Sequence, residues 1–302
     1  MSEEKLIDID VTTGAAEAPP VISEWRRFRR VFFQRKLVMF GLSVLFLLVF
    51  CAAFASFISP HDPYRGKMAD SLVQPSREYP LGTDIQGRDT LSRLIYGTRT
   101  VLMVGFITVT VAAVIGVTLG LTAGFFGGIA NMILMRAIDA LMAFPMLLLA
   151  LLLSAVLGGG IQNVIIALSI ALIPGYARVA HGLTLSIKEN DYILAERAMG
   201  ASNRRSIFGH ILPNALPPMI VMVSAQLGTL ILAEATLSFL GIGIKPPGAA
   251  WGSMVSDGYQ YLLSNPLLSF APGLAIMLVV FAFFMVGDGL RDALDPRLRG
   301  LL

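Results

Sequence analysis

The chain has little charge and almost no cysteine. Of its 302 residues, 14% are charged, three are histidines and one is a cysteine. Cys51 alone can form neither a disulfide within the chain nor a multi-cysteine metal site. His61, His181 and His210 fall in segments predicted on opposite sides of a membrane, which argues against a shared metal site. The formal net charge of +3 is small, so the charge does not indicate a nucleic-acid partner.

Three kinds of pattern are also missing from the sequence. The glycine-rich phosphate loop G-x-x-x-x-G-K-S/T does not occur, so we expect the chain to bind no nucleotide of its own. The lack of an internal repeat weakens the case for a secondary transporter built from duplicated halves. The apolar runs offer no convincing nucleophile or facing pair of acids, which argues against an intramembrane enzyme. We therefore predict no catalytic residue, no metal site and no cofactor in this chain.

Hydrophobic residues, in contrast, are abundant. They make up 55% of the sequence, and the mean hydropathy is +0.73, which is typical of an integral membrane protein. A membrane helix needs about 20 apolar residues. Six apolar runs meet this need and predict an all-α, multi-pass protein with six transmembrane helices: 37–59, 100–124, 132–157, 162–180, 217–243 and 267–287.

The basic residues predict the orientation. Six of them precede the first apolar run, between Arg26 and Lys36, and the positive-inside rule holds such a cluster in the cytoplasm. Both termini and the 181–216 loop are then cytoplasmic, and the 60–98 and 244–266 loops lie outside. We divide the chain into a cytoplasmic tail with a basic juxtamembrane segment (1–36), a first helix with its outer loop (37–98) and a five-helix core (99–302). The first 23 residues are polar and without periodicity, and we expect them to be disordered.

Glycine and proline mark particular points in the spans. Gly116, Gly120 and Gly124 recur every four residues and leave one helix face bare, which favours close packing within the bundle or against a second subunit. Pro145 and Pro174 remove backbone donors inside the third and fourth runs. We therefore expect kinks at both prolines.

Charged residues in or near the spans invite further predictions. Arg136 and Asp139 are three residues apart and are expected to pair with each other. Glu234 has no basic neighbour in the sequence, and it either lines a pathway or braces another subunit.

The end of the first outer loop has an amphipathic pattern. Asp89 stands four residues before Arg93, the favourable order for an ion pair on a helix. We expect a short helix on the outer membrane surface that acts as a structural collar or as a ligand gate. Its apolar face would hold Leu91, Leu94 and Ile95, and its cap would be Thr83 or Asp84.

Residues 191–213 form a charged, helix-forming stretch between two spans. Tyr192 to Met199 predicts two helical turns closed by Gly200, and Ser202 can cap a second helix that Pro213 helps to end. Helices this short are marginal in water, so they gain order by packing on something else. The apolar patch of Ile193, Leu194 and Ala198 is surrounded by Glu196, Arg197, Arg204 and Arg205. This suits a small helix docked in a groove of a cytoplasmic partner, and the alternative is a loop that lies on its own bundle or on lipid headgroups.

The spacing of Gly200, nine further residues and then His210-Ile-Leu-Pro213 resembles the "EAA" loop of binding-protein-dependent ABC importer permeases. Six further segments resemble the C-type permease subunit of the dipeptide and oligopeptide importers, and the resemblance covers nearly everything after residue 25. One departure concerns the loop itself. Leu194 occupies the position of the family's glutamate and Glu196 that of its second alanine, so whether Glu196 replaces that glutamate stays open. The six segments are LGTDIQGRD (81–89), SRLIYGTR (92–99), MRAIDALMAFP (135–145), LSFLGIGIKPP (237–247), WGSMVSDG (251–258) and GDGLRDALDPRL (287–298).

The resemblance implies a type I ABC importer permease in a bacterial cytoplasmic membrane. Its partners would be a homologous permease subunit, two cytoplasmic ATPase subunits that bind ATP and Mg, and an extracytoplasmic solute-binding protein that delivers a peptide. The ATPase-coupling loop would comprise Tyr192, Ile193, Leu194, Ala195, Glu196, Arg197, Ala198, Gly200, Ala201, Ser202, His210 and Pro213.

Two kinds of alternative stay open. The same architecture can import nickel, glutathione or another small solute, because cargo preference can lie largely in the binding protein. A more remote alternative is an ATP-independent channel or secondary transporter, which would need polar residues distributed over several spans.

Overall fold

The structure is a computed structural model that describes residues 24–294, and the tail predicted to be disordered (1–23) lies outside this part. The regular secondary structure of the described residues is helical, apart from one isolated bridge between Thr83 and Asp89. The longer helices are α1 (Glu24–Gln34), α2 (Lys36–Ile58), α3 (Thr90–Phe126), α4 (Gly128–Met142), α5 (Met146–Leu157), α6 (Ile161–Lys188), α7 (Asp191–Ala198), α9 (Leu212–Phe239), α10 (Trp251–Tyr259) and α11 (Leu267–Leu294). The shorter ones are η1 (Met68–Asp70), α8 (Asn203–Arg205) and the π-helix η2 (Ser206–Ile211).

Five helical stretches in the described part are long and apolar enough to cross a membrane: α2, α3, α6, the continuous stretch from α8 to α9, and α11. The pair α4 and α5 brings the number to six if it counts as one span, and its helices meet at 87°. The break follows from Pro145, which lies directly before α5 and cannot continue the hydrogen-bonding of a preceding helix. A kink was predicted there, but the change of direction is a full break. At Pro174 the chain does not break, and α6 continues through this residue.

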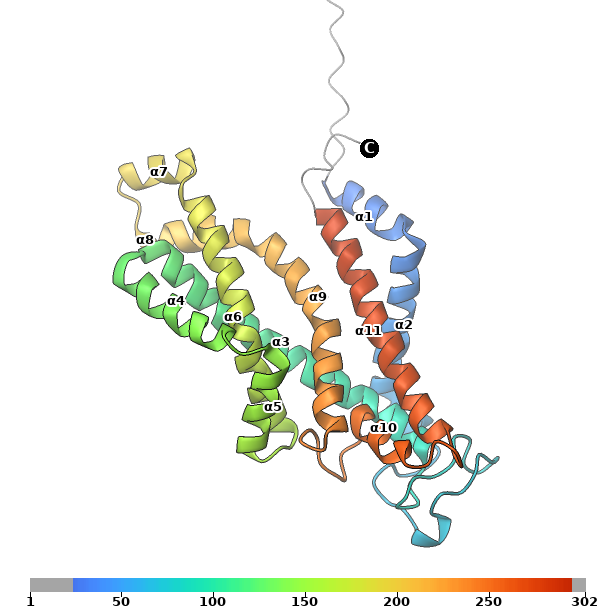
Figure 1. The fold of residues 1–302 in the computed structure, drawn as a ribbon. Coiled ribbons are helices and arrows are strands. Elements are labelled where there is room, and N and C mark those ends of the chain that lie inside the picture. The colour runs from blue at the N-terminus through green and yellow to red at the C-terminus, as the bar shows by residue number, and fades with distance from the viewer. Residues whose placement is uncertain (1–23, 295–302) are drawn as a thin grey trace, which may run out of the picture.

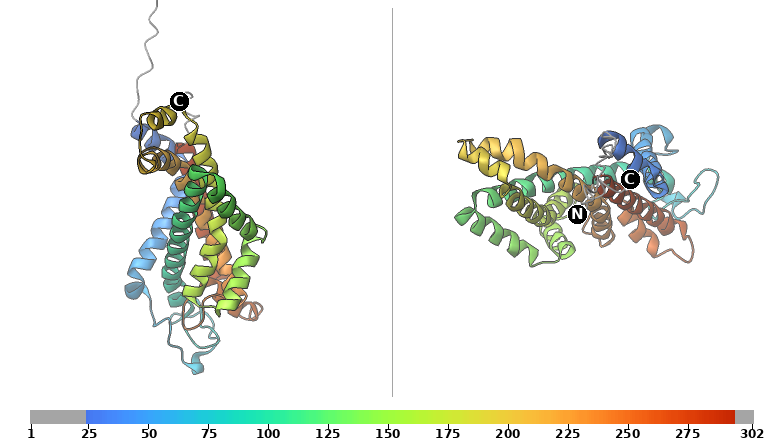
Figure 2. Two further views of the ribbon diagram at one scale, coloured as in Figure 1. Left: turned by 90° about the vertical axis from the view of Figure 1, so that its left-hand side faces the viewer. Right: turned by 90° about the horizontal axis from the view of Figure 1, so that it is seen from above.

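The elements predicted to be cytoplasmic share one end of the bundle. Figure 1 shows α1, the last turns of α11 and α7 at one end, and the 59–89 loop with α10 at the other. The end-on view in Figure 2 shows α1, α2 and α11 together on one side and α4 to α7 on the other. The grouping agrees with the predicted alternation of loops. That the α7 end is cytoplasmic stays a prediction, as do the boundaries at residues 36 and 98.

The prediction that the three glycines of α3 provide a close helix contact is confirmed, and the partner is α6 of the same chain. A Cβ atom on Gly116 would lie 2.6 Å from Cβ of Tyr176, and one on Gly120 would lie 2.3 Å from the carbonyl oxygen of Ala177. A Cβ on Gly124 would lie 2.8 Å from that of Thr184. The two backbones approach along three turns because nothing projects between them.

The first span packs against the last. Gly41 of α2 lies close to α11, since an added Cβ would be 3.0 Å from the carbonyl oxygen of Ala282. Gly289 of α11 leaves room for Val38 in the same way, with 2.4 Å between an added Cβ and Cγ2 of Val38. An ion pair between Arg35 and Asp292 joins the same two elements at one end of the contact.

The short surface helix predicted at the end of the outer loop does not form. Residues 81–88 form turns, a bend and one bridge position but no helix, and α3 starts at Thr90 and continues without interruption to Phe126. The helix cap is Asp89, whose Oδ2 accepts from the backbone N of Ser92 at 2.8 Å, rather than Thr83 or Asp84. The carboxylate of Asp89 is thus used by the cap, and Arg93 instead reaches Oδ2 of Asp84 at 3.5 Å. The predicted pair of Asp89 with Arg93 was therefore wrong.

Candidate functional site

The 191–213 loop forms a helical hairpin at one end of the bundle, with α7 as its outermost helix (Figure 1). The predicted end of the first helix at Gly200 is confirmed: α7 ends at Ala198, and Gly200 has a φ of +84°. This left-handed backbone suits glycine. It lets the N–H of Ala201 donate to the carbonyl of Glu196 at 3.2 Å. The predicted cap of the second helix is also confirmed, since Oγ of Ser202 accepts from the N–H of Arg205 at 3.4 Å.

Pro213, in contrast, does not end the second helix. The chain passes from α8 through the π-helix η2 into α9 without a break, and Pro213 lies in the first turn of α9. The π-helix Ser206–Ile211 departs from α-helical pairing directly before Pro213, and local π-turns of this kind can satisfy backbone groups that a proline leaves free. The loop is thus mechanically continuous with a membrane-spanning helix.

The residues that α7 exposes differ from those of the predicted apolar patch. Ile193 is fully buried, so it is not part of an exposed surface, while Leu194 is 52% exposed. Ala195 and Ala198 are exposed on the same side as Leu194. Glu196, predicted to surround the patch with charge, is instead 8% exposed and faces inward.

Glu196 lies between two basic side chains of the second half of the hairpin. Its Oε2 is 3.3 Å from Nε2 of His210, and its Oε1 is 3.4 Å from Nε of Arg205. Tyr192 lies edge-on to the His210 ring at 6.1 Å between ring centroids. Nδ2 of Asn214 is 2.7 Å from the carbonyl oxygen of His210 and 3.4 Å from the Tyr192 hydroxyl. These contacts join α7 to η2 and the start of α9.

The loop rests on the adjoining end of α3. Ile211 is fully buried in a cluster with Leu121 and Phe125. Nζ of Lys188 donates to the carbonyl oxygen of Phe125 at 3.0 Å, which satisfies one of the free carbonyls at the end of α3. The guanidinium carbon of Arg197 lies 5.7 Å from the centre of the Phe125 ring. Part of the loop therefore packs on its own bundle, as the alternative interpretation expected, while the Leu194 side of α7 stays free.

A groove with a volume of about 570 Å³ begins directly beside this loop. Its walls come from α3, η2 and α9, and they are apolar apart from Thr118 and Thr122, whose hydroxyls donate to carbonyls of their own helix. Ile207 and Phe208 of η2 form the end of the groove nearest the loop. A displacement of η2 would therefore change the shape of the groove.

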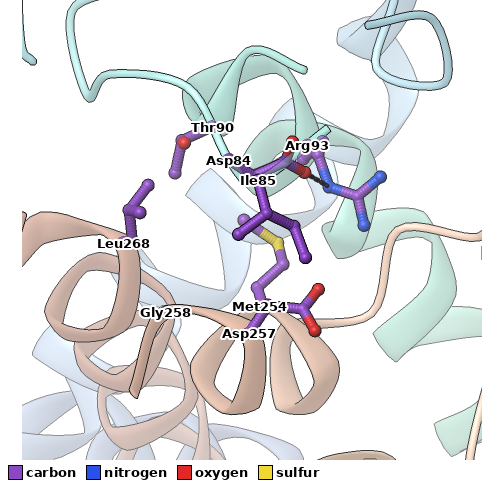
Figure 3. A pocket seen from close by; sticks show the side chains of 8 residues that line it. All are labelled: Asp84, Ile85, Thr90, Arg93, Met254, Asp257, Gly258 and Leu268. Atoms are coloured by element: carbon purple, nitrogen blue, oxygen red, sulfur yellow. Dashed lines mark ion pairs between the residues drawn. The ribbon is translucent and has the colours of Figure 1, made fainter. Parts of the chain in front are cut away.

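At the opposite end, the outer loop closes over a buried cluster of charges that we did not predict (Figure 3). Arg88 and Arg93 are each 2% exposed. The Asp84 carboxylate accepts from Nε of Arg88 at 2.7 Å and from the backbone N–H of Gln86 and of Arg88. The signal in the sequence is the concentration of three carboxylate or guanidinium groups in TDIQGRD.

This charge cluster connects the outer loop to α10. Nη1 and Nη2 of Arg93 donate to the carbonyls of Pro63 and Gly248 at 3.2 and 3.4 Å. Burial raises the pKa of the Asp257 carboxyl, against the opposing effect of Arg88 and Arg93. The space between Asp84, Arg93 and Asp257 has a volume of only about 10 Å³, about that of one water molecule. The cluster is thus a packed junction rather than a ligand pocket.

The remaining predicted charges have different partners. Arg136 does not pair with Asp139, because Asp139 forms its ion pair with Arg178 of α6.

Glu234 is 2% exposed, and its Oε1 accepts from Oγ of Ser238 at 2.7 Å. Its carboxyl group is enclosed within the chain, so neither an open pathway wall nor a surface that braces another subunit fits its position.

Comparison with known proteins agrees with this architecture. Residues 116–300 match the family model described as the binding-protein-dependent transport system inner membrane component. Residues 23–76 match the N-terminal TM domain of oligopeptide transport permease C. Among solved structures, two of the inward-facing MetNI methionine ABC transporter superpose on 67% of this chain and on 96% and 97% of theirs, with TM-scores of 0.53 and 0.54. Their sequence identities of 23% and 24% support the fold alone.

Curated relatives are more similar in sequence. The dipeptide transport system permease protein DppC of Alkalihalophilus pseudofirmus is 41% identical over 278 residues, which is 92% of this chain and 91% of the relative. The glutathione transport system permease protein GsiD of Pectobacterium atrosepticum is 43% identical over 91% of this chain and 90% of its own length. The di/tripeptide transport system permease protein DppC of Pseudomonas aeruginosa is 39% identical over 92% and 93%. The chain belongs to the family of binding-protein-dependent transport system inner membrane components, the permease subunits of ABC importers.

Proposed function

We propose that this chain is the permease subunit of an ATP-driven importer for di- and oligopeptides. It would form half of the translocation pathway together with a homologous permease subunit. Two cytoplasmic ATPase subunits would bind ATP and Mg, and an extracytoplasmic binding protein would deliver the peptide. The observation that carries the proposal is the helical hairpin at 191–213, whose outermost helix exposes one side and whose second half continues into a membrane-spanning helix.

The geometry supplies a route for coupling. When the ATPase subunits close, they would push on α7, and the contacts of Glu196 with Arg205 and His210 would carry that movement to η2. Because η2 continues into α9 and lines the groove beside α3, the movement would reshape the groove. A rigid-body shift of this kind is a common way to alternate between two open states.

The relatives favour a peptide as the cargo. Two of the similar permeases are named for dipeptide or di- and tripeptide transport, and a third for glutathione. Glutathione is itself a modified tripeptide, so it is the second candidate cargo for the same pathway. Nickel and other small solutes are further outcomes that a transport assay distinguishes.

The test is uptake into proteoliposomes that contain this chain together with the products of its neighbouring genes. A labelled peptide library is compared between the wild type and Gly200→Pro, because proline cannot adopt the φ of +84° that α7 needs at its end. Gly182→Ala is the matched control: Gly182 lies within α6, and an added Cβ meets nothing within 4 Å. We expect uptake that requires ATP and the binding protein, that persists in the control, and that is lost in Gly200→Pro while the complex still assembles.

Three other outcomes would change the proposal. Uptake that persists without the ATPase subunits would overturn the importer mechanism. Unchanged uptake by Gly200→Pro would remove the coupling role from the hairpin. ATP-dependent uptake of glutathione or nickel in place of peptides would retain the mechanism and replace the cargo.

A further inference from the structure

The coupling hairpin separates its charged and its apolar side chains in an unexpected way. Residues three or four positions apart lie on the same face of a helix. Ile193 and Glu196 accordingly point together into the protein, and both are buried. Leu194, Ala195 and Ala198 share the outer face and are exposed, and the exposed Asp191 lies one turn before them on the same face. The centre of the outer face of α7 is therefore small and apolar, with one acidic residue at its N-terminal edge, while Glu196 is turned away from any partner that could dock there.

The carboxylate of Glu196 is already engaged inside the hairpin. Only 8% of Glu196 is exposed, and the basic groups of His210 and Arg205 lie at 3.3 and 3.4 Å from its two oxygens. Neither contact has the geometry of a hydrogen bond, and both oxygens are otherwise without a hydrogen-bond partner among the described residues. A buried carboxylate is costly unless a positive charge stays close to it. The position of α7 is therefore linked to the positions of His210 and Arg205.

The following inference rests on the proposed function. We propose that the hairpin binds its ATPase through the apolar face of Leu194, Ala195 and Ala198. Glu196 is then a positioning residue held by His210 and Arg205. The partner surface would be an apolar groove on the ATPase, wide enough for one short helix. Because Glu196 is held inside the hairpin, this groove on the ATPase would need no basic side chain to pair with it.

The division of roles has a mechanical consequence. The face that receives the push and the carboxylate that passes it on are on opposite sides of the same two-turn helix. A push on Leu194 would press Glu196 toward His210 of η2, so α7 and η2 would move as one body. Without the pairing, α7 could tilt independently, and the ATPase would hydrolyse ATP without moving α9.

The first test is a double-mutant cycle in the reconstituted importer, with Glu196→Gln, His210→Gln and both together. Arg204→Gln is the control, since Arg204 is an exposed cation of the same hairpin with no ion pair to another described residue. We expect each single variant to transport about fivefold less peptide per ATP hydrolysed or worse. The double variant should lose no more than the worse single variant, and Arg204→Gln should behave like the wild type.

Several outcomes would overturn the positioning role. A loss in Glu196→Gln with normal coupling in His210→Gln would show that the glutamate acts outside the hairpin, on the ATPase. Losses that multiply in the double variant would show that the two side chains act separately. Normal coupling in all variants would show that the pairing carries no movement. In each of these cases, ATP-dependent uptake by the wild type would leave the proposed function intact.

The second test addresses the apolar face directly and does not depend on the buried pair. The ATPase subunits are bound to detergent-solubilised permease complex containing Leu194→Glu or the control Leu194→Met. A charge buried in an apolar groove should weaken binding about tenfold or more, which is about 1.4 kcal/mol, whereas methionine should change it little. Wild-type affinity of Leu194→Glu would refute the apolar contact, because it would show that the receiving surface is polar or that α7 does not dock.

Discussion

The contact between α3 and α6 allows a quantitative prediction about Gly120. A Cβ atom there would lie 2.3 Å from the carbonyl oxygen of Ala177, 2.8 Å from Cβ of Ala180 and 2.8 Å from the backbone N of His181. Carbon and carbonyl oxygen normally approach to about 3.3 Å, so α6 would have to retreat by about 1 Å. Two of the three atoms belong to the backbone, and a change of rotamer therefore cannot relieve the clash.

The matched control for Gly120→Ala is Gly105→Ala on the same helix. Gly105 is buried as well, but an added Cβ would be 3.7 Å from its nearest neighbour, Cδ2 of Leu227, an ordinary van der Waals contact. Both substitutions gain about 1 kcal/mol of helix propensity, which cancels when the two variants are compared. The difference in stability is then the cost of overpacking, about 1–3 kcal/mol.

The measurement is the apparent unfolding temperature of the purified protein in one detergent at one concentration, followed by circular dichroism. We expect Gly105→Ala to unfold at or above the temperature of the wild type and Gly120→Ala to unfold clearly below both. Equal unfolding temperatures for the two variants would refute the reasoning, because they would show that α6 yields at no cost and that the glycine spacing does not determine the helix contact.

Three further predictions concern ionisable side chains. Asp84→Ala leaves two buried guanidinium groups without their counter-ion, so it should cost about 3–5 kcal/mol and lower both the unfolding temperature and the yield in membranes; wild-type values would contradict the buried cluster. Because the pKa of Asp257 is raised by burial, its contribution to stability is present below the ordinary aspartate pKa and is lost as the pH rises through the raised value. Asp257→Asn should therefore reduce the loss of stability between acidic and neutral pH in thermal unfolding, and an unchanged pH profile would argue against the burial. Asp139 of α4 and Arg178 of α6 form an ion pair within the part of the bundle that spans the membrane, where water does not screen them as at a soluble protein's surface, so a double-mutant cycle with Asp139→Asn and Arg178→Gln should give a coupling of about 1 kcal/mol or more; a coupling near zero would show that the pair is hydrated like one on a water-facing surface.

The parts of the fold that depend on neighbouring residues could be predicted from the sequence. The spans follow from apolar length, and the ends of the hairpin helices follow from the conformational freedom of Gly200 and the capping hydroxyl of Ser202, both of which act within a few residues. The spacing of the glycines in α3 likewise indicates a close helix contact, although it does not name α6 as the partner. These signals lie within one or two helical turns, where local geometry decides the outcome.

The incorrect predictions concern partners that are distant in the sequence. Arg136 is three residues from Asp139, but Arg178 is brought to it by the packing of α6 against α4. Asp84 was expected to cap a helix, and it is instead the counter-ion of two buried arginines. Glu196 is similar, because a charged residue on a short helix ordinarily faces water, and its burial is explained by the positions of His210 and Arg205 in the second half of the hairpin. A sequence pattern does not show which distant element supplies a counter-charge.

The contact of α2 with α11 has a consequence for how the protein is made. A ribosome adds about 5–20 residues per second, and more than 200 residues separate Gly41 from the α11 residues around Ala282 that it contacts. The face of α2 that α11 will cover therefore stays open for roughly 10–45 s after α2 has been synthesised. During that time lipid or the insertion machinery must occupy this face. Substitutions such as Gly41→Leu should consequently impair the last step of assembly in the membrane while leaving the insertion of the first helix normal.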